Sequence, residues 1–123
     1  MSDSTNPKDL IGVKKPRLSL CSPAGMVYES LAMGDGSVKY GSFNFRHKKV
    51  QALIYVDACM RHLLSWVDRE ENAKDSGLPH LGHAKACLGI LIDALETGNL
   101  IDDRPAPGKT ADIIERYTKK DAK

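Results

Sequence analysis

Two histidines, His80 and His83, stand three residues apart, directly after a turn that is rich in carboxylates. Side chains at this spacing lie on the same face of a helix, so both imidazoles can meet one ion or one ligand. The turn adds possible oxygen ligands at Glu70, Glu71 and Asp75. Mixed nitrogen and oxygen ligation favours a divalent metal such as Mn²⁺, Co²⁺ or Zn²⁺, or Mg²⁺ where carboxylates dominate.

A further acid, base and cation stand one helix earlier, at Asp57, His62 and Arg61. Asp57 and Arg61 share one edge of the predicted helix, and His62 lies near the other margin of its apolar face. The residues that we expect to hold the metal are carboxylates and imidazoles: Asp57, Glu70, Asp75, His80 and His83. Each feature also has a structural explanation, because satisfied core histidines, solvated acidic turns and i,i+4 ion pairs are all common.

The segment KYGSFNFR, residues 39–46, combines residue types that bind nucleotides. Lys39 and Arg46 can neutralise phosphates, and Asn44 can read the edge of a base. Gly41 allows the backbone to approach a ligand closely. The aromatic side chains that can stack on a base are Tyr40, Phe43 and Phe45. The alternative is a loop whose aromatic side chains plug the open side of a helix hairpin.

Two helices are expected to position these residues. The first covers about residues 48–68, where apolar residues recur at helical spacing: Leu53, Val56, Met60, Leu63, Leu64 and Val67. The second begins at Pro79 and ends one or two residues before Gly98, which terminates it. Its polar residues form one narrow stripe: Gly82, Lys85, Gly89, Asp93 and Glu96. The opposite side carries both histidines together with Ala84, Cys87, Leu91 and Ala94.

The rest of the chain is predicted to be shorter or irregular. Ser22 and Pro23 are typical of a helix N-terminus, and the short helix that follows is expected to be closed by Gly34 and Gly36. The segment 37–49 is expected to be a loop, since glycine, asparagine and serine interrupt it.

The expected fold is all-α: a helix-hairpin core with short flanking helices, and with irregular segments at 14–20 and 37–49 packed over one end. A last short amphipathic helix is expected after Thr110. The helices are few and short for a monomer, so we expect a homodimer or a higher oligomer. The chain is expected to divide into three parts: a flexible N-terminal arm (1–13), one helical domain (14–118) and a basic tail (119–123).

Composition narrows the class of protein. Of 123 residues, 41% are hydrophobic and 28% are charged, as in ordinary globular domains. The formal charge of +2, from 18 basic and 16 acidic residues, gives no general attraction to polymeric nucleic acid or to membranes. No run approaches the roughly 20 apolar residues of a membrane span, and the start is polar, so we expect a cytoplasmic protein. Three widely spaced cysteines are expected to be free thiols.

Six motifs follow one another along the chain: NPKDLIGVKKPRLSL, SPAG, GDGSVKYGSFNFR, YVDACMRHLLSW, DSGLPHLGHAKACLGILIDALETG and LIDDRP. In this order they resemble the small phage and prophage proteins of the dATP/dGTP diphosphohydrolase N-terminal-domain family, over residues 6 to about 117. The residues that stand where the family's motifs have them are Lys39, Tyr40, Gly41, Asn44, Arg46, Asp57, Arg61, His62, Glu70, Asp75, His80 and His83. Phe45 departs from the tryptophan that is expected after the asparagine.

The resemblance implies metal-dependent hydrolysis of a purine deoxynucleoside triphosphate, dATP or dGTP, to the monophosphate and pyrophosphate. This activity serves the control of nucleotide pools by a phage, in the cytoplasm of its bacterial host. The related MazG-like pyrophosphatases are all-α and usually oligomeric, with metal sites of ExxE and ExxD type. His80 and His83 stand at those ligand spacings, although they replace carboxylates by imidazoles.

The resulting hypothesis gives each candidate residue a role. The metal would bind the triphosphate and lower the pKa of an attacking water. The catalytic group is Asp57, Arg61, His62 and Glu70, with His62 as a proton shuttle. The substrate-binding group is Lys39, Tyr40, Gly41, Asn44 and Arg46. Two alternatives stay open: a nucleotide-binding or sensing module without hydrolysis, and a helical adaptor oligomer in which the histidines are structural.

Overall fold

The computed structural model describes residues 6–120, and this part of the chain is mostly helical. The predicted helical class is confirmed, with one small pair of strands added. The elements are α1 (Pro7–Gly12), a 3₁₀ turn (Leu18–Leu20), α2 (Pro23–Tyr40), α3 (Asn44–His47), β1 (Val50–Gln51), α4 (Ala52–Val67), α5 (His80–Thr97), β2 (Leu100–Ile101) and α6 (Thr110–Tyr117). None of the described helices has the length and hydropathy needed to cross a membrane. Residues 1–5 of the predicted arm and 121–123 of the predicted tail lie outside the described residues.

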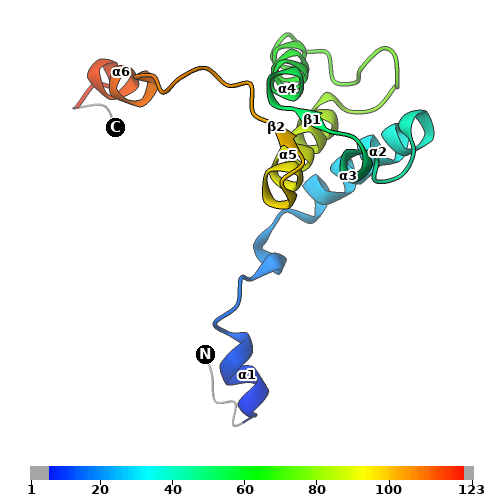
Figure 1. Ribbon diagram of the computed structural model, residues 1–123, viewed down its shortest axis with the longest axis vertical. Helices are drawn as coiled ribbons and strands as arrows, with labels where there is room; N and C mark the ends of the chain where they lie inside the picture. The colour runs from blue at the N-terminus through cyan, green and yellow to red at the C-terminus, as the bar shows by residue number, and fades with distance from the viewer. Residues whose placement is uncertain (1–5, 121–123) are drawn as a thin grey trace.

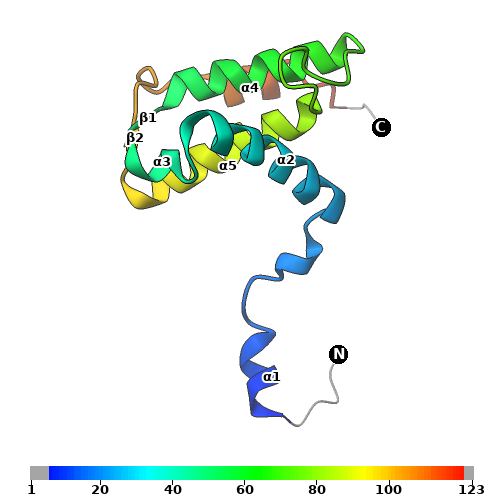
Figure 2. The same ribbon diagram turned by 90° about the vertical axis from the view of Figure 1, so that its right-hand side faces the viewer.

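Helix α5 is the centre of the body, because α2 and α4 both pack against it (Figures 1 and 2). It begins directly after Pro79, and Gly98 terminates it in the left-handed conformation at φ 72°, as predicted. The buried core consists mainly of small side chains: Ala32, Ala52, Cys59, Ala84, Ala86 and Ala94. Small side chains let the helices approach closely, but each one removes little apolar surface from water.

Helices α2 and α5 come into closest contact at Gly82. A side chain at this position would overlap the backbone carbonyl of Tyr28, since its first carbon would lie 2.9 Å from the carbonyl carbon. On the same side of α5, Lys85 Nζ lies 3.8 Å from Glu29 Oε1 on α2. The part of the predicted polar stripe from Gly82 to Gly89 therefore faces α2, and the glycine at position 82 allows the two backbones to meet.

Helix α2 is longer than predicted. It begins at Pro23 and is capped by Ser22, as expected, but it continues through Gly34 and Gly36. Glycine lowers helix propensity by about 1 kcal/mol without breaking the helical hydrogen bonds, and packing against α5 supports this helix. The helix ends instead at Gly41, whose φ of 93° is readily adopted only by glycine.

The segment 37–49, predicted to be a loop, is largely helical. Its first residues complete α2, and the short helix α3 follows a tight turn in which Phe43 adopts a left-handed φ of 59°. Arg46 of α3 holds Asp93 of α5 through two bonds, Nε to Oδ2 at 2.5 Å and Nη2 to Oδ1 at 2.8 Å. This bidentate pair fixes α3 against α5.

The segment after α5 fixes the N-terminus of α4. Strands β1 and β2 pair in parallel, with Val50 opposite Leu100. Helix α4 has no cap from its own side chains, and Asp103 supplies one: its Oδ1 accepts from the Leu53 N–H at 2.8 Å. This bond, together with one from the side chain of Gln51, lowers the pKa of Asp103. Helix α4 begins later than predicted because the residues before it form the strand and this cap.

The acidic turn between α4 and α5 folds back on itself. The N–H of Ala73 donates to the Leu78 carbonyl at 2.8 Å, and the N–H of Gly77 donates to the Ala73 carbonyl at 2.8 Å. Gly77 adopts a φ of 73°, which the turn requires. The N–H of His80 donates to the Glu71 carbonyl at 2.9 Å, so the end of α4 and the start of α5 lie side by side.

The apolar face predicted for α4 is only partly buried, since Leu53 and Val56 are half-buried and its other members are exposed. The residues that α4 buries are Ala52 and Cys59. The larger side chains Met60, Leu64 and Val67 are 53%, 63% and 65% exposed. Helix α4 therefore buries small residues against α5, which permits close packing, and leaves Met60, Leu64 and Val67 on the surface.

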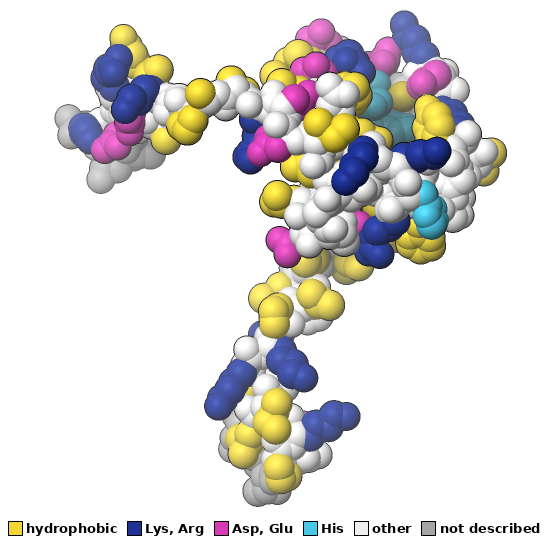
Figure 3. Space-filling view, in the orientation of Figure 1, with side chains coloured by type: hydrophobic (Ala, Val, Ile, Leu, Met, Phe, Trp, Pro, Cys, Tyr) yellow, Lys and Arg dark blue, Asp and Glu magenta, His cyan; other side chains and the backbone are white. Residues whose placement is uncertain are grey.

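Two segments reach away from the body (Figure 1). The N-terminal segment contains α1 and the 3₁₀ turn. The prediction that residues 14–20 pack over one end of the hairpin is wrong, because this segment leads away from the body. The C-terminal segment ends in α6. Both carry hydrophobic side chains on their surfaces (Figure 3), which include Leu10, Ile11, Val13, Leu18, Leu20, Ile113, Ile114 and Tyr117. These side chains have few neighbours to cover them within one chain.

The exposed surface is large for a chain of this size. It measures 10038 Å². A compact monomer of 13.5 kDa is expected to expose only roughly 6,500 Å². This excess of exposed surface is within the range of areas that obligate homodimer interfaces bury, about 2,000–5,000 Å². We therefore expect a second copy of the chain to cover the outer face of α4 and the two extended segments.

The close approach at Gly82 predicts a strong effect of a single methyl group. Gly82→Ala should lower the free energy of unfolding by about 1–3 kcal/mol, since the helices must separate to admit it. Urea denaturation measures the change. Gly34→Ala is the matched control: nothing lies within 4 Å of its added carbon, so this helical substitution should stabilise the protein by about 0.4–1 kcal/mol. Equal effects of the two substitutions would contradict the packing described for α2 and α5.

The exposed α4 face predicts self-association. Light scattering coupled to size exclusion should give a mass of at least two chains. Leu64→Glu places a charge in the middle of this face and should shift the mass toward one chain. Asn72→Glu adds the same charge in the polar turn and should leave the mass unchanged. A monomeric wild-type protein would contradict the expectation.

Candidate functional site

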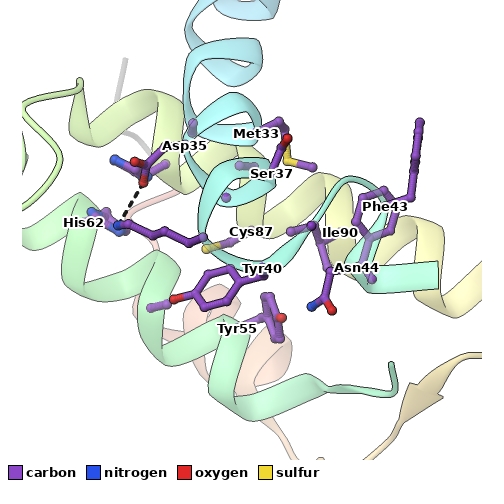
Figure 4. A pocket seen from close by; sticks show the side chains of 18 of the residues that line it. Met33, Asp35, Ser37, Tyr40, Phe43, Asn44, Tyr55, His62, Cys87 and Ile90 are labelled. Atoms are coloured by element: carbon purple, nitrogen blue, oxygen red, sulfur yellow. Dashed lines mark ion pairs between the residues drawn. The ribbon is translucent and has the colours of Figure 1, made fainter. Parts of the chain in front are cut away.

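A pocket of about 290 Å³ lies between the C-terminal half of α2, α3, α4 and α5. Asp35 and His62 lie toward one end of it and Asn44 toward the other, with Tyr40 and Tyr55 between them (Figure 4). The volume is at the lower end of the range for small-molecule sites, about 300–1,000 Å³. A pocket of this volume has room for only part of a nucleotide-sized ligand, and the remainder of such a ligand would extend into solvent.

The middle of the pocket and the end at Asn44 are aromatic and uncharged. Tyr40 stands at the surface and Tyr55 is half-buried, which raises the pKa of the Tyr55 hydroxyl. The rings of Phe43 and Phe45 lie with their centroids 6.0 Å apart. Within residues 6–120, no hydrogen bond engages the side-chain amide of Asn44. This end offers stacking surfaces and a free amide to a ligand.

The other end of the pocket is charged. Lys39 Nζ lies 3.0 Å from Asp35 Oδ2, one turn earlier on α2, and Figure 4 marks this ion pair. The bond and the charge of Asp35, with a smaller contribution from Asp75, raise the pKa of Lys39. Asp75 comes from the acidic turn, and its Oδ1 accepts from the Ser76 N–H at 2.9 Å. That bond, supported by the charge of Lys39, lowers the pKa of Asp75.

Three histidines meet between α4 and α5. His62 Nδ1 and His80 Nδ1 are 2.8 Å apart. The rings of His62 and His83 are stacked, with centroids 4.8 Å apart and planes inclined by 13°. His80 is buried, and only 5% of its surface is exposed, whereas His62 and His83 line the pocket. The prediction that His80 faces inward is thus correct, and its i,i+3 partner forms part of the pocket wall.

Glu70 adds a carboxylate to this group, at the ring nitrogen of His80 that does not contact His62. Its Oε1 lies 2.6 Å from His80 Nε2. The hydrogen bond from His80 and the nearby charge of Lys74 hold the pKa of Glu70 below its usual range. Glu70 reaches His80 because the turn folds the end of α4 back beside the start of α5. Partial burial, with smaller contributions from the charges of His83 and His80, lowers the pKa of His62.

Ser76 holds the third imidazole. Its Oγ lies 2.7 Å from His83 Nε2 and accepts from the N–H of Leu78 at 3.1 Å. The turn therefore orients both histidines of α5, one through a carboxylate and the other through a hydroxyl. Such bonds fix ring orientation and decide which nitrogen carries a proton.

The structure gathers seven of the predicted site residues around the pocket: Lys39, Tyr40, Gly41, Asn44, His62, Asp75 and His83. Arg46 is not among them, since its guanidinium is bound to Asp93. Asp57 and Arg61 are exposed on α4, away from the pocket lining. No ion pair joins these two residues within the part of the chain that the structure describes.

The predicted ligands do not fit a metal ion in this arrangement. Both ring nitrogens of His80 are engaged, with His62 and with Glu70. His83 Nε2 is engaged with Ser76, and Asp57 is remote from the pocket. Across the described residues, no three or more histidine, cysteine or acidic side chains come together in a group that could hold a metal. Of the expected ligands, His80 and Glu70 are bonded to each other, and His83 and Asp75 are bonded to Ser76.

Sequence reasoning missed three residues of this site. Asp35 lies one turn before Lys39, and that i,i+4 spacing would have identified it if α2 had been continued through its glycines. Ser76 in the DSG turn is a typical hydrogen-bonding turn residue. Tyr55 shares with His62 one margin of the predicted apolar face of α4, and the structure places it in the pocket wall.

Comparison with known proteins gives one family. Residues 5–104 match the sequence model of the family described as "dATP/dGTP diphosphohydrolase, N-terminal". A curated protein of Salmonella phage PMBT28, named dATP/dGTP diphosphohydrolase, is 30% identical over 90 residues. That match covers 73% of this chain, which spans only about 30% of the length of the phage protein. No solved structure matches the chain.

The lowered pKa of His62 predicts a pH-dependent stability. His62 binds a proton more readily in the unfolded chain than in the folded one. Its contribution to the free energy of unfolding is therefore fully present at pH values above the ordinary histidine pKa of about 6.5. It is lost as the pH falls through the folded-state value. Thermal unfolding at pH 7.5 and pH 5.5 should show a lower Tm at the acidic pH, and His62→Gln should reduce the difference. His47→Gln, outside the cluster, is the control, and an unchanged difference in His62→Gln would contradict the prediction.

Proposed function

Because the chain belongs to the dATP/dGTP diphosphohydrolase N-terminal domain family, we propose that it binds a purine deoxynucleoside triphosphate in the pocket between α2 and α5. We propose further that it hydrolyses dATP or dGTP to the monophosphate and pyrophosphate. The observation that carries this proposal is the division of the pocket, with aromatic rings and an amide at one end and imidazoles beside a lysine at the other.

The uncharged end suits the purine. A base stacked on Tyr40 or Phe43 gains about 1–3 kcal/mol from each such contact. The free amide of Asn44 can donate and accept together, as adenine or guanine edges require. Tyr55 gives the pocket an aromatic wall with one polar atom. The sequence motif and the pocket thus support the same assignment of the base.

The charged end suits the phosphates and the attacking water. Lys39 would exchange its bond to Asp35 for one to a phosphate oxygen, since an ammonium group can redirect its donors. Water attacks the α-phosphorus, its oxygen forms the new bond, and the bond from this phosphorus to the bridging oxygen breaks. Pyrophosphate leaves with that oxygen. A neutral imidazole of the pocket, on His62 or His83, accepts the proton of the water.

The divalent metal that the resemblance implies has no defined place in this proposal. His80, His83 and Glu70, which were expected to bind it, are engaged in hydrogen bonds with other side chains, so no step is assigned to it. The protein that we propose to be active is a homo-oligomer whose ligand is a purine deoxynucleotide.

A second candidate function is binding without hydrolysis. The chain spans only about 30% of the phage protein that it resembles, so the pocket would serve as a nucleotide-binding module beside a separate catalytic part. The two candidates differ in one observable, because only the enzyme releases pyrophosphate.

The test combines both measurements on one sample. Each dNTP is added with and without Mg²⁺ or Mn²⁺, and thermal stability and released pyrophosphate are recorded together. A ligand at 100 times its Kd should stabilise the folded chain by about 2.7 kcal/mol. Stabilisation with pyrophosphate supports the enzyme, and stabilisation alone supports the binding module. The absence of both effects with every dNTP would contradict the nucleotide site.

Asn44 offers the sharpest variant. Asn44→Ala removes the amide that faces the base and should raise KM, or Kd for binding, by about 10-fold to 100-fold. Its effect on kcat should be small, because Asn44 stands at the end of the pocket away from the histidines. Asn72→Ala removes an exposed amide in the turn and is the matched control. An unchanged KM in Asn44→Ala would contradict the assignment of the base.

A further inference from the structure

We propose that Glu70 and His80 form a hydrogen-bonded relay that holds His62 in the tautomer protonated at Nδ1. His62 Nε2 is then the proton acceptor that the pocket presents to a ligand or a water. This inference deepens the proposed function, on which its catalytic part rests, by assigning the base and two positioning residues. The tautomer of His62 does not depend on the proposed function, because it exists in the chain without a nucleotide.

The relay begins at Glu70, whose charge determines which ring nitrogen of His80 carries the hydrogen. An ionised carboxylate accepts hydrogen bonds and donates none. Glu70 Oε1 lies 2.6 Å from His80 Nε2, so this nitrogen must carry the hydrogen. The Lys74 ammonium, 3.7 Å from the other carboxylate oxygen Oε2, favours the ionised form of Glu70. His80 is buried among these partners, which leaves its ring no alternative bond to water.

The second step passes through His80. A neutral imidazole carries one N–H, and here Nε2 holds it, so Nδ1 is a lone pair. The Nδ1 atoms of His80 and His62 are 2.8 Å apart, and a hydrogen bond between them needs one donor. His62 must therefore donate from its own Nδ1. The single ring hydrogen of His62 is then on Nδ1, and its Nε2 carries a lone pair.

His62 Nε2 is accessible as well as unprotonated. No hydrogen bond of the described residues engages this atom, and His62 lines the pocket. Within the same residues, no buried side-chain nitrogen or oxygen lacks a partner, so Nε2 must reach solvent-accessible space. A solvent-accessible lone pair in the wall of a pocket is what a general base requires.

His83 and the groups of the turn keep this ring in place. The stacked ring of His83, at 4.8 Å, opposes rotation of His62, and Ser76 fixes His83 in turn. Partial burial lowers the pKa of His62 and so favours its neutral form. The charged groups at the same end of the pocket are Asp75 from the turn and the ion pair of Lys39 with Asp35.

The relay also stabilises the product of proton transfer. When Nε2 takes the proton of an attacking water, the positive charge forms on His62, which still donates from Nδ1 to His80. His80 still donates to Glu70, whose negative charge lies at the far end of the chain of bonds. A buried carboxylate that orients a histidine acts by the same logic in catalytic triads. Here one more imidazole separates the carboxylate from the base.

The test reads the tautomers directly. Long-range ¹H–¹⁵N spectra of the ¹⁵N-histidine-labelled full chain at pH 7.5, without nucleotide, distinguish protonated from unprotonated ring nitrogens. We expect His62 to be protonated at Nδ1 only and His80 at Nε2 only. Signals are assigned by their loss in His62→Gln and His80→Gln. Protonation of His62 at Nε2, or of His80 at both nitrogens, would overturn the relay.

Glu70→Gln tests the cause. An amide can donate as well as accept, so His80 loses the constraint on its tautomer. We expect His62 to become a mixture of tautomers and kcat to fall at least about tenfold, or about 1.4 kcal/mol, with KM unchanged. Glu96→Gln is the matched control, since Glu96 is exposed near the C-terminal end of α5, away from the histidines; it should change neither quantity. A wild-type tautomer of His62 in Glu70→Gln would overturn the relay. The absence of pyrophosphate release would contradict the proposed function alone, because the spectra need no nucleotide.

Discussion

The close packing of α5 against α2 and α4 is the constraint on which the rest of the structure depends. It is possible because Gly82 leaves room for the backbone of Tyr28 and because the buried residues of all three helices, apart from His80, are small. This arrangement holds the end of α2 and α3 opposite the histidines, and the space between them is the pocket. The same arrangement leaves large apolar residues such as Leu64 exposed on the surface.

The histidine cluster follows from the general requirement that buried polar groups be satisfied. His80 meets it with two partners of the same chain, so its nitrogens set the proton positions of its neighbours. A pair of imidazoles at i and i+3 beside an acidic turn thus has two solutions, a metal site or an internal hydrogen-bond network. The geometry of the turn, which brings Glu70 to His80, selects the second solution in this structure.

Some of this could be predicted from the sequence. The bounds of α5 have local causes in Pro79 and Gly98, and so could be assigned correctly. The length of α2 could not, because its glycines are tolerated only through tertiary packing. Helical spacing identified an apolar face on α4 but not what covers it. The role of His80 depends on a contact ten residues away from it, at Glu70, which no helical period describes.

The most direct measurement is a titration of the ¹⁵N-labelled chain with dGTP and dATP, in which the NMR chemical shifts of the backbone amides are recorded. The account predicts saturable shifts for at least one of the two nucleotides. They should be concentrated in residues 39–45 and at His62 and His83, which surround the pocket, and absent from α1 and α6. No saturable shift with either nucleotide, or shifts confined to the outer face of α4, would contradict the assignment of the pocket as a nucleotide site.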